Sequence, residues 1–118
     1  KGIEIMLVKS GEGMHEYRVI RNGVGEILMV NKFGPDETAN RCKMVAELNL
    51  APGQCTGFHG HTDDVELFYM LEGELICVED GEEVTLKPGD CTSTCSGAKH
   101  QIINRSEEMA KVLAIVIK

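Results

Sequence analysis

Short apolar runs recur along the chain and are separated by residues that favour turns. There are about nine or ten runs, with turn signals roughly every 8–12 residues, a spacing typical of an all-β sandwich or barrel. Segments 35–41 and 105–110 have some helical character, but neither is capped and apolar enough to compete with this pattern. We expect strands at 17–20, 26–30, 42–50, 66–71, 74–78, 83–86, 91–95, 100–104 and 111–117.

The clearest turn signal is Asp80-Gly81, which lies between two of the predicted strands. Both central positions of a two-residue hairpin turn favour positive φ, so this pair predicts a tight hairpin. The chain shows no internal repeat, low-complexity segment or linker, and its 118 residues match the size of one domain. We therefore expect residues 1–118 to form a single domain with one modest core.

The charge balance is acidic, with 12 lysines and arginines against 19 aspartates and glutamates, a net charge of −7. An acidic surface repels phosphate backbones and anionic lipids, which argues against nucleic acids and membranes as partners. Tryptophan is absent and aromatic residues make up 4% of the chain, so the stacking platforms of a single-strand binder are missing.

The cysteines and the apolar runs indicate a cellular compartment. The five cysteines are an odd number and form no Cys-x-x-Cys pair, so a disulfide framework or a zinc ribbon fits poorly. No secretory apolar region stands at the start, and the longest apolar run, 112–117, is far shorter than the ~20 residues of a membrane span. We expect a cytoplasmic protein with reduced thiols.

Three of the four histidines suggest a metal site. His59 and His61 are two apart, so on a strand their imidazoles project from the same face. A turn through 62–64 would bring Glu66 back beside them, and His100 would join from another strand. Three imidazoles and a carboxylate suit manganese, iron, nickel, cobalt, copper or zinc, and not calcium. His15 stands alone, and we assign it to a surface or turn position.

The spacing around these residues is more specific than a His-x-His pair, which often occurs by chance. Residues 53–73 read Gly-x5-His-x-His-x4-Glu-x6-Gly, and residues 89–104 read Gly-x5-Cys-x-Gly-x2-His-x3-Asn. Both spacings resemble the two motifs of the cupin superfamily. The single departure is Cys95, which stands where the family has proline. We interpret Cys95 as a small residue in a tolerant loop; a contact with substrate or metal is the alternative.

The resemblance implies a small single-domain cupin with a double-stranded β-helix, a jelly-roll-like barrel. It implies that His59, His61, Glu66 and His100 bind one divalent transition metal inside the barrel. Such a ligand set leaves two positions of a six-coordinate ion open to a bidentate oxygen ligand. The motif glycines would shape turns, and Asn104 would serve a hydrogen-bond network rather than the metal. The resemblance also implies a homodimer.

Strand alternation predicts which side chains surround the metal. Phe68 and Met70 share the face of Glu66, Ile102 shares that of His100, and Cys55 shares that of His59, so we expect these four to line the cavity. No arginine or lysine is predicted to face the metal, and we expect Asp63 and Asp64 at the cavity rim or in solvent. No general acid or base is identified, so the catalytic residues are unknown.

Three functions are compatible with this sequence. The first is a metal-dependent enzyme acting on a small oxygenated metabolite, such as a carboxylate, keto acid or sugar, by dioxygenase, decarboxylase or isomerase chemistry. The second is a non-catalytic protein that binds or senses a small molecule, with the metal holding the ligand or only the barrel. The third is an interaction protein with a vestigial site, which the complete ligand set disfavours.

Overall fold

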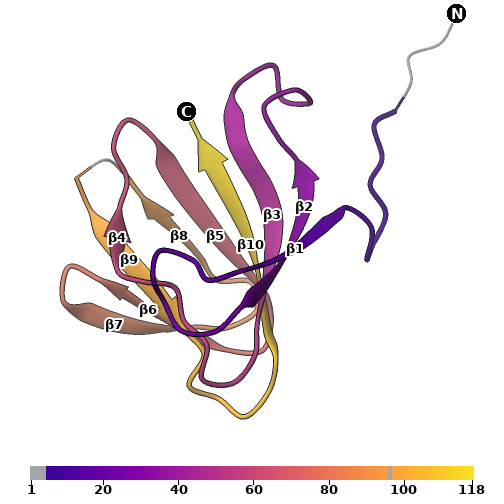
Figure 1. Cartoon of the computed structure of the whole chain (residues 1–118). Coiled ribbons are helices and arrows are strands. Elements are labelled where there is room, and N and C mark those ends of the chain that lie inside the picture. The colour runs from indigo at the N-terminus through magenta and orange to yellow at the C-terminus, as the bar shows by residue number, and fades with distance from the viewer. Residues whose placement is uncertain (1–4, 96) are drawn as a thin grey trace, which may run out of the picture.

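The computed structural model describes residues 5–95 and 97–118, which form ten β-strands and no α-helix (Figure 1). The all-β prediction is confirmed. Within the described residues, no helix has the length and apolar character needed to cross a membrane. The strands are β1 (Met14–Arg18), β2 (Ile27–Phe33), β3 (Cys42–Leu50), β4 (His59–Gly60), β5 (Val65–Glu72), β6 (Leu75–Glu79), β7 (Glu82–Leu86), β8 (Cys91–Thr94), β9 (Lys99–Ile103) and β10 (Ala110–Ile117).

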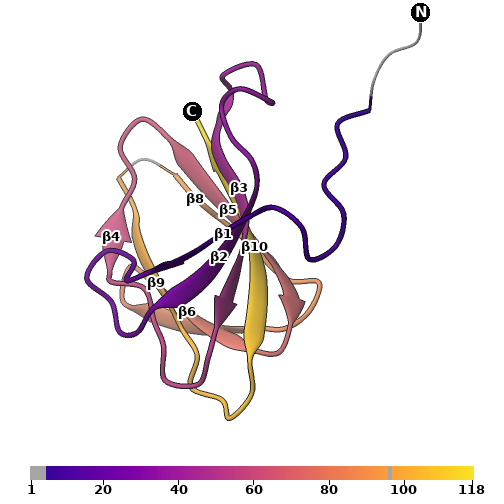
Figure 2. The same cartoon turned by 45° about the vertical axis from the view of Figure 1, so that its right-hand side comes forward.

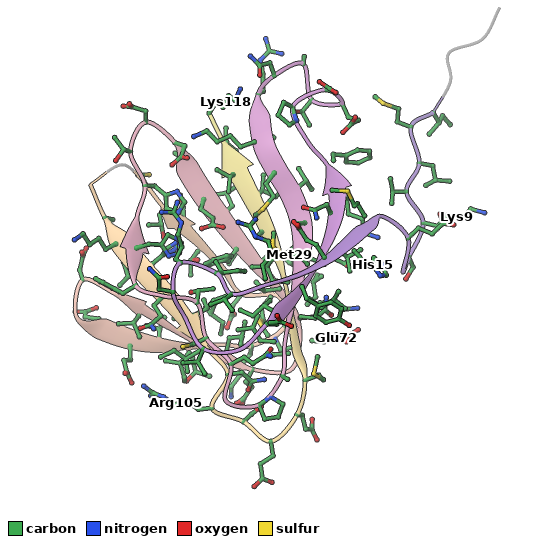
Figure 3. All side chains as sticks on the ribbon, in the orientation of Figure 1. Lys9, His15, Met29, Glu72, Arg105 and Lys118 are labelled. Atoms are coloured by element: carbon green, nitrogen blue, oxygen red, sulfur yellow. The ribbon has the colours of Figure 1, made fainter. Side chains whose placement is uncertain are left out.

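The strands form two antiparallel sheets that enclose the core between them (Figures 1 and 2). The larger sheet has the order β1-β2-β3-β10-β5-β8, and the smaller has the order β4-β9-β6-β7. The core draws side chains from both sheets, for example Met29 from β2, which is labelled in Figure 3, and Ile102 from β9. This arrangement is the barrel that the sequence predicted.

The burial pattern of β10 illustrates why these segments are strands. Ala110, Val112, Ala114 and Val116 are buried, while the residues between them are half-buried on the outer face. Side chains of a strand alternate between its faces, so every second residue reaches the core. Burial of such side chains contributes about 1.5–3 kcal/mol for each large one. Because β10 lies between β3 and β5, this pattern anchors the centre of the larger sheet.

The first strand differs from the prediction. We expected residues 17–20, but β1 is Met14–Arg18 and pairs with β2 from Met14↔Asn31 to Arg18↔Ile27. Only Glu16 of this strand is not exposed, so β1 carries no alternation that a sequence could reveal. The strand is at the edge of its sheet and is held mainly by backbone pairing. Neither of the two weakly helical segments forms a helix; 35–41 folds into hydrogen-bonded turns.

The predicted hairpin and the motif turns are present. Asp80 and Gly81 have φ of 50° and 80°, and they join β6 to β7. The four motif glycines also have positive φ, at residues 53, 73, 89 and 97. Asn104 is fully buried and donates to the carbonyls of Leu50 at 2.9 Å and Glu108 at 2.8 Å. It therefore fixes the chain after β9, in line with the network role that the sequence suggested.

Candidate metal centre

The fold brings the four predicted ligands together. His59 lies on β4, Glu66 on β5 and His100 on β9, and His61 follows directly after β4. His59 is paired with His100 across the β4–β9 ladder, while Glu66 comes from the facing sheet. One ligand atom from each residue lies within 4.8 Å of all the others, so the group could hold a metal ion.

The spacing of the ligand atoms fits a single ion. The Nε2 atoms of His61 and His100 are 3.1 Å apart, and those of His100 and His59 are 3.2 Å apart. Glu66 Oε1 is 2.9 Å from the Nε2 atoms of both His61 and His100, and 3.8 Å from that of His59. With metal–nitrogen distances of about 2.1 Å, ligands at right angles would be about 3.0 Å apart. The donor set therefore matches a divalent transition metal.

The outer nitrogens of two histidines are fixed by acceptors. His59 Nδ1 donates to the carbonyl oxygen of Gly57 at 2.8 Å, and His61 Nδ1 donates to Asp64 Oδ1 at 2.8 Å. A carbonyl and a carboxylate only accept hydrogen bonds, so both Nδ1 atoms carry a proton, and each ring in its neutral form keeps the Nε2 lone pair for a metal. These lone pairs point toward the same centre as the Glu66 carboxylate. Such a convergence of acceptors is stabilised by a cation.

Burial strengthens the electrostatic character of the group. His100 is fully buried, and His61 and Glu66 are buried almost as completely. Burial acts to raise the pKa of Glu66, but hydrogen bonds from His100 and His59 and the charges of His100 and His61, which are available when protons occupy the place of an ion, lower this pKa to about 2. Glu66 is therefore a carboxylate at neutral pH, and it supplies one negative charge to the centre.

Asp64 belongs to the site, although the sequence placed it at the rim or in solvent. Its side chain is 10% exposed, and it bonds to His61 through Oδ1 and to Lys43 through Oδ2, at 2.9 Å from the Nζ atom. Burial acts to raise the pKa of Asp64, but hydrogen bonds from Lys43 and His61 lower it below its ordinary value. Asp64 thus orients the imidazole of His61 from outside the metal centre.

A pocket of about 220 Å³ opens onto three of the four ligands. Two arginines, Arg18 and Arg21, are among the residues that line it, and the sequence had assigned neither of them to the site. The rest of the wall is mostly apolar. It consists of Ile20, Met29, Met44, Leu48, Thr56, His59, His61, Glu66, Phe68 and Val116.

Long-range backbone contacts bring the loop that carries Arg21 to the pocket, next to Arg18 at the end of β1. Gly57 N donates to Ile20 O at 2.9 Å, and Val24 and Cys55 form an isolated bridge. A side chain at residue 57 would collide with the carbonyl oxygen of Arg21, so only glycine allows this approach. Gly57 is the one feature of the sequence that indicates a close backbone contact here, and it does not identify the loop that packs against it.

The predicted cavity residues separate into two groups. Phe68 lines the pocket, and its ring stacks on His100 with centroids 5.1 Å apart and planes at 16°. Met70 and Ile102 are fully buried in the core and are not part of the pocket wall, since a step of two residues along a strand moves a side chain by roughly 7 Å. Cys55 is half-buried and contacts Gln101, away from the pocket wall.

The remaining histidine and cysteines lie elsewhere. His15, labelled in Figure 3, is exposed on β1, and its Nε2 atom is 3.0 Å from the carbonyl oxygen of Gly11. Cys95 is exposed, and its Sγ atom is 3.9 Å from Ser93 Oγ, so its contacts are outside the pocket wall. All five cysteines are free thiols, in agreement with the absence of a disulfide framework.

The chain resembles known proteins over almost its whole length. It is 33% identical over 114 residues to the "Oxalate-binding protein" of Thermotoga maritima, an alignment that covers 95% of this chain and 93% of the relative. It is 29% identical over 79 residues to the tetracenomycin polyketide synthase protein TcmJ of Streptomyces glaucescens, covering 67% and 53% of the two chains.

Solved structures share the same architecture. The crystal structure of a predicted oxalate decarboxylase from Thermotoga maritima superposes with a TM-score of 0.91 at 33% identity, covering 95% of this chain and 98% of the other. A cupin 2 conserved barrel protein from Salinispora arenicola gives a TM-score of 0.73 at 20% identity, covering 100% and 91%, and supports the fold alone. The cupin domain family matches residues 46–116, which include all four candidate ligands. The chain therefore belongs to the cupin family.

Proposed function

We propose that this cupin binds a small carboxylate at a divalent transition metal held by His59, His61, Glu66 and His100. The observation that carries the proposal is that this ligand group opens into the same small pocket as Arg18 and Arg21. A bound divalent metal would supply a positive charge that attracts and polarises a carboxylate. The relative named "Oxalate-binding protein", which aligns over 95% of the chain, supports the same ligand class.

The charges in and around the pocket favour an anion. A divalent metal with Glu66 and three neutral imidazoles carries a net charge of +1, and the two arginines add two more positive charges. A guanidinium presents a planar fork of donors that matches a carboxylate in a bidentate manner. One carboxylate could therefore bind the metal, while a second group of the same ligand meets Arg18 or Arg21.

The size of the pocket restricts the ligand. Sites for drug-sized molecules usually measure about 300–1,000 Å³, whereas this pocket measures about 220 Å³. Met29, Met44 and Leu48 contribute an apolar part of its wall. We infer that the ligand has only a few carbon atoms, as in oxalate, malonate or pyruvate.

Calorimetric titration with oxalate tests the proposed function. We expect the protein loaded with Mn²⁺ to bind oxalate, and the chelator-treated protein not to bind it. Arg21→Gln and Arg18→Gln should each weaken binding about 10- to 100-fold, because a charge-assisted hydrogen bond contributes about 1.5–3 kcal/mol. Arg41→Gln is the matched control, since Arg41 is exposed and is not part of the pocket wall.

Two results would overturn binding as the function. One is the absence of oxalate, malonate and pyruvate binding by the metal-loaded protein. The other is turnover: if oxalate disappears and formate accumulates in the same samples, observed by NMR, the protein is an enzyme of the decarboxylase type.

Equal affinity of the two pocket variants and the Arg41 control would remove the arginines from the proposal. Elemental analysis of protein purified without chelator would identify the metal.

We further propose that two chains associate through the outer face of the larger sheet. The support is an apolar hollow of about 350 Å³ lined in part by Leu67, Tyr69, Leu113 and Ile115, with Tyr69 47% exposed. Exposed apolar patches of this kind often mark interfaces. Sedimentation velocity should find a dimer, and Leu113→Lys should shift it to the monomer; a monomer at all concentrations would contradict the proposal.

A further inference from the structure

A chain of two hydrogen bonds runs from His100 away from the metal centre. Thr94 Oγ1 lies 2.9 Å from His100 Nδ1, and the Thr94 hydroxyl donates to Glu79 Oε1 at 2.6 Å. Thr94 and His100 are both fully buried. Thr94 is on β8 of the larger sheet, whereas Glu79 and His100 are paired across β6 and β9 of the smaller sheet. The contacts therefore join the two sheets directly behind one metal ligand.

The number of protons in this chain determines the state of the His100 ring. A threonine hydroxyl has one proton, and here that proton is donated to the Glu79 carboxylate. Thr94 can then meet His100 Nδ1 only as an acceptor, so Nδ1 must carry the ring proton. A neutral imidazole with its proton on Nδ1 keeps a lone pair on Nε2, the atom that lies among the other ligand atoms.

We propose that Glu79, acting through Thr94, is a positioning residue that holds His100 in the tautomer required for metal binding. Without the Glu79 carboxylate, the Thr94 hydroxyl is free to turn and donate to Nδ1. That contact stabilises the opposite tautomer, in which a proton on Nε2 occupies the direction of the metal. His59 and His61 have backbone and carboxylate acceptors of their own, so His100 is the ligand whose tautomer depends on a rotatable hydroxyl.

A substitution of Glu79 has a matched control in Glu82. It lines a hollow of about 380 Å³ between β8 and the β6–β7 hairpin, together with Glu82 on the facing strand. Glu79 and Glu82 are cross-strand partners at the end of this hairpin, and no hydrogen bond joins Glu82 to Thr94. Replacement of Glu82 thus removes the same charge from the same hairpin without disturbing the Thr94–His100 contact.

The inference rests on the proposed metal site and deepens it, so the first measurement uses metal-free protein. Side-chain ¹⁵N spectra at about pH 8, above the ordinary titration range of imidazole, report which nitrogen of His100 carries the proton. We expect a proton on Nδ1 in the wild type and in Glu82→Ala, and a substantial population without this proton in Glu79→Ala. An unprotonated Nδ1 in the wild type, or identical spectra for the two variants, would overturn the inference.

The second measurement is the affinity for Ni²⁺ by calorimetry. Loss of a group that orients a metal ligand typically costs about 10- to 100-fold in affinity, which is the loss expected for Glu79→Ala relative to Glu82→Ala. Thr94→Val should reproduce the loss of affinity, whereas Thr94→Ser keeps the hydroxyl and should bind Ni²⁺ like the wild type. If Glu79→Ala does not fold, these two variants test the inference in its place. A wild type that binds no Ni²⁺ would overturn the metal site itself, and equal affinities in all variants would overturn only the positioning role.

Discussion

His61 and Asp64 form a hydrogen bond of 2.8 Å between Nδ1 and Oδ1, and the same carboxylate forms an ion pair with Lys43 at 2.9 Å. Lys43 lies on β3, so the ion pair ties the loop that carries Asp64 to the larger sheet. The ring of His61 is thereby oriented by a group that is itself anchored. This arrangement gives a metal ligand that is positioned before any ion binds.

Asp64→Asn should therefore weaken metal binding. The amide is a weaker acceptor than the carboxylate and loses the ion pair with Lys43, so the His61 ring is held less firmly. We expect a loss of about tenfold in Ni²⁺ affinity, measured by calorimetry. Asp63→Asn is the control, because it removes the same charge from the neighbouring residue, which is exposed. Equal affinities for the two variants would show that Asp64 does not orient His61.

Metal binding should stabilise the fold. Because the four ligand atoms converge only in the folded chain, an ion bound to them favours the native state. Free metal at a hundred times its Kd adds about 2.7 kcal/mol. For a domain of this size the corresponding rise in Tm is about 10 °C.

Calorimetric melting of the protein with Ni²⁺ and with chelator measures this shift. His15→Gln should keep the whole shift, since His15 is on β1 outside the group, whereas His100→Gln should lose most of it. A shift of the same size in both variants would mean that the ion binds elsewhere.

The sequence predicted the four ligands because their positions follow from local rules. The alternation of side chains along an extended segment suggested that His59 and His61 point the same way, although His61 lies just after β4, and the motif spacing connects them to Glu66 and His100. The strand pattern likewise predicted the fold, since most strands bury one face. The predicted range of the first strand was wrong, because the residues of β1 are mostly exposed on both faces of the strand and are held by backbone pairing.

The pocket around the ligands could not be predicted in the same way. Arg18 is at the end of β1, and Arg21 is in the following loop, whose position depends on contacts with residues 55–57, more than thirty residues away along the chain. Asp64 orients His61 through a turn geometry that alternation does not describe. The sequence predicts Thr94 only as a strand residue and leaves Glu79 just beyond the predicted strand 74–78; the hydrogen bond between them is seen only in the folded chain.

The thiols should differ in reactivity. Burial, with the nearby charges of Glu79 and Glu66, raises the pKa of Cys77 to about 11, and this side chain is 2% exposed. Cys91 and Cys95 are exposed. With a disulfide reagent at about pH 8, we expect rapid modification of the two exposed cysteines and none of Cys77 until the chain unfolds. Peptide mapping identifies the sites, and guanidinium-unfolded protein supplies the control in which all five react. Rapid modification of native Cys77 would contradict its burial.

Phe68 connects the stability of the core to the metal site. It is 2% exposed, belongs to the core cluster, and stacks on the ring of His100. Phe68→Ala leaves a cavity and should lower the free energy of unfolding by about 3–5 kcal/mol. The same change removes the surface that supports His100, so metal affinity should fall as well.

Leu50→Ala separates the two effects expected of Phe68→Ala, which are the loss of stability and the loss of metal affinity. Leu50 is fully buried in the same core, on β3, and is not part of the pocket wall at the ligand group. We expect it to cost about 2–5 kcal/mol of stability and to leave Ni²⁺ affinity close to the wild type, at temperatures where both variants are folded. Urea unfolding in chelator gives the stability, and calorimetry gives the affinity. If the two variants bound the ion equally well, Phe68 would contribute packing alone, and the ring of His100 would be held by Thr94 and the backbone of β9.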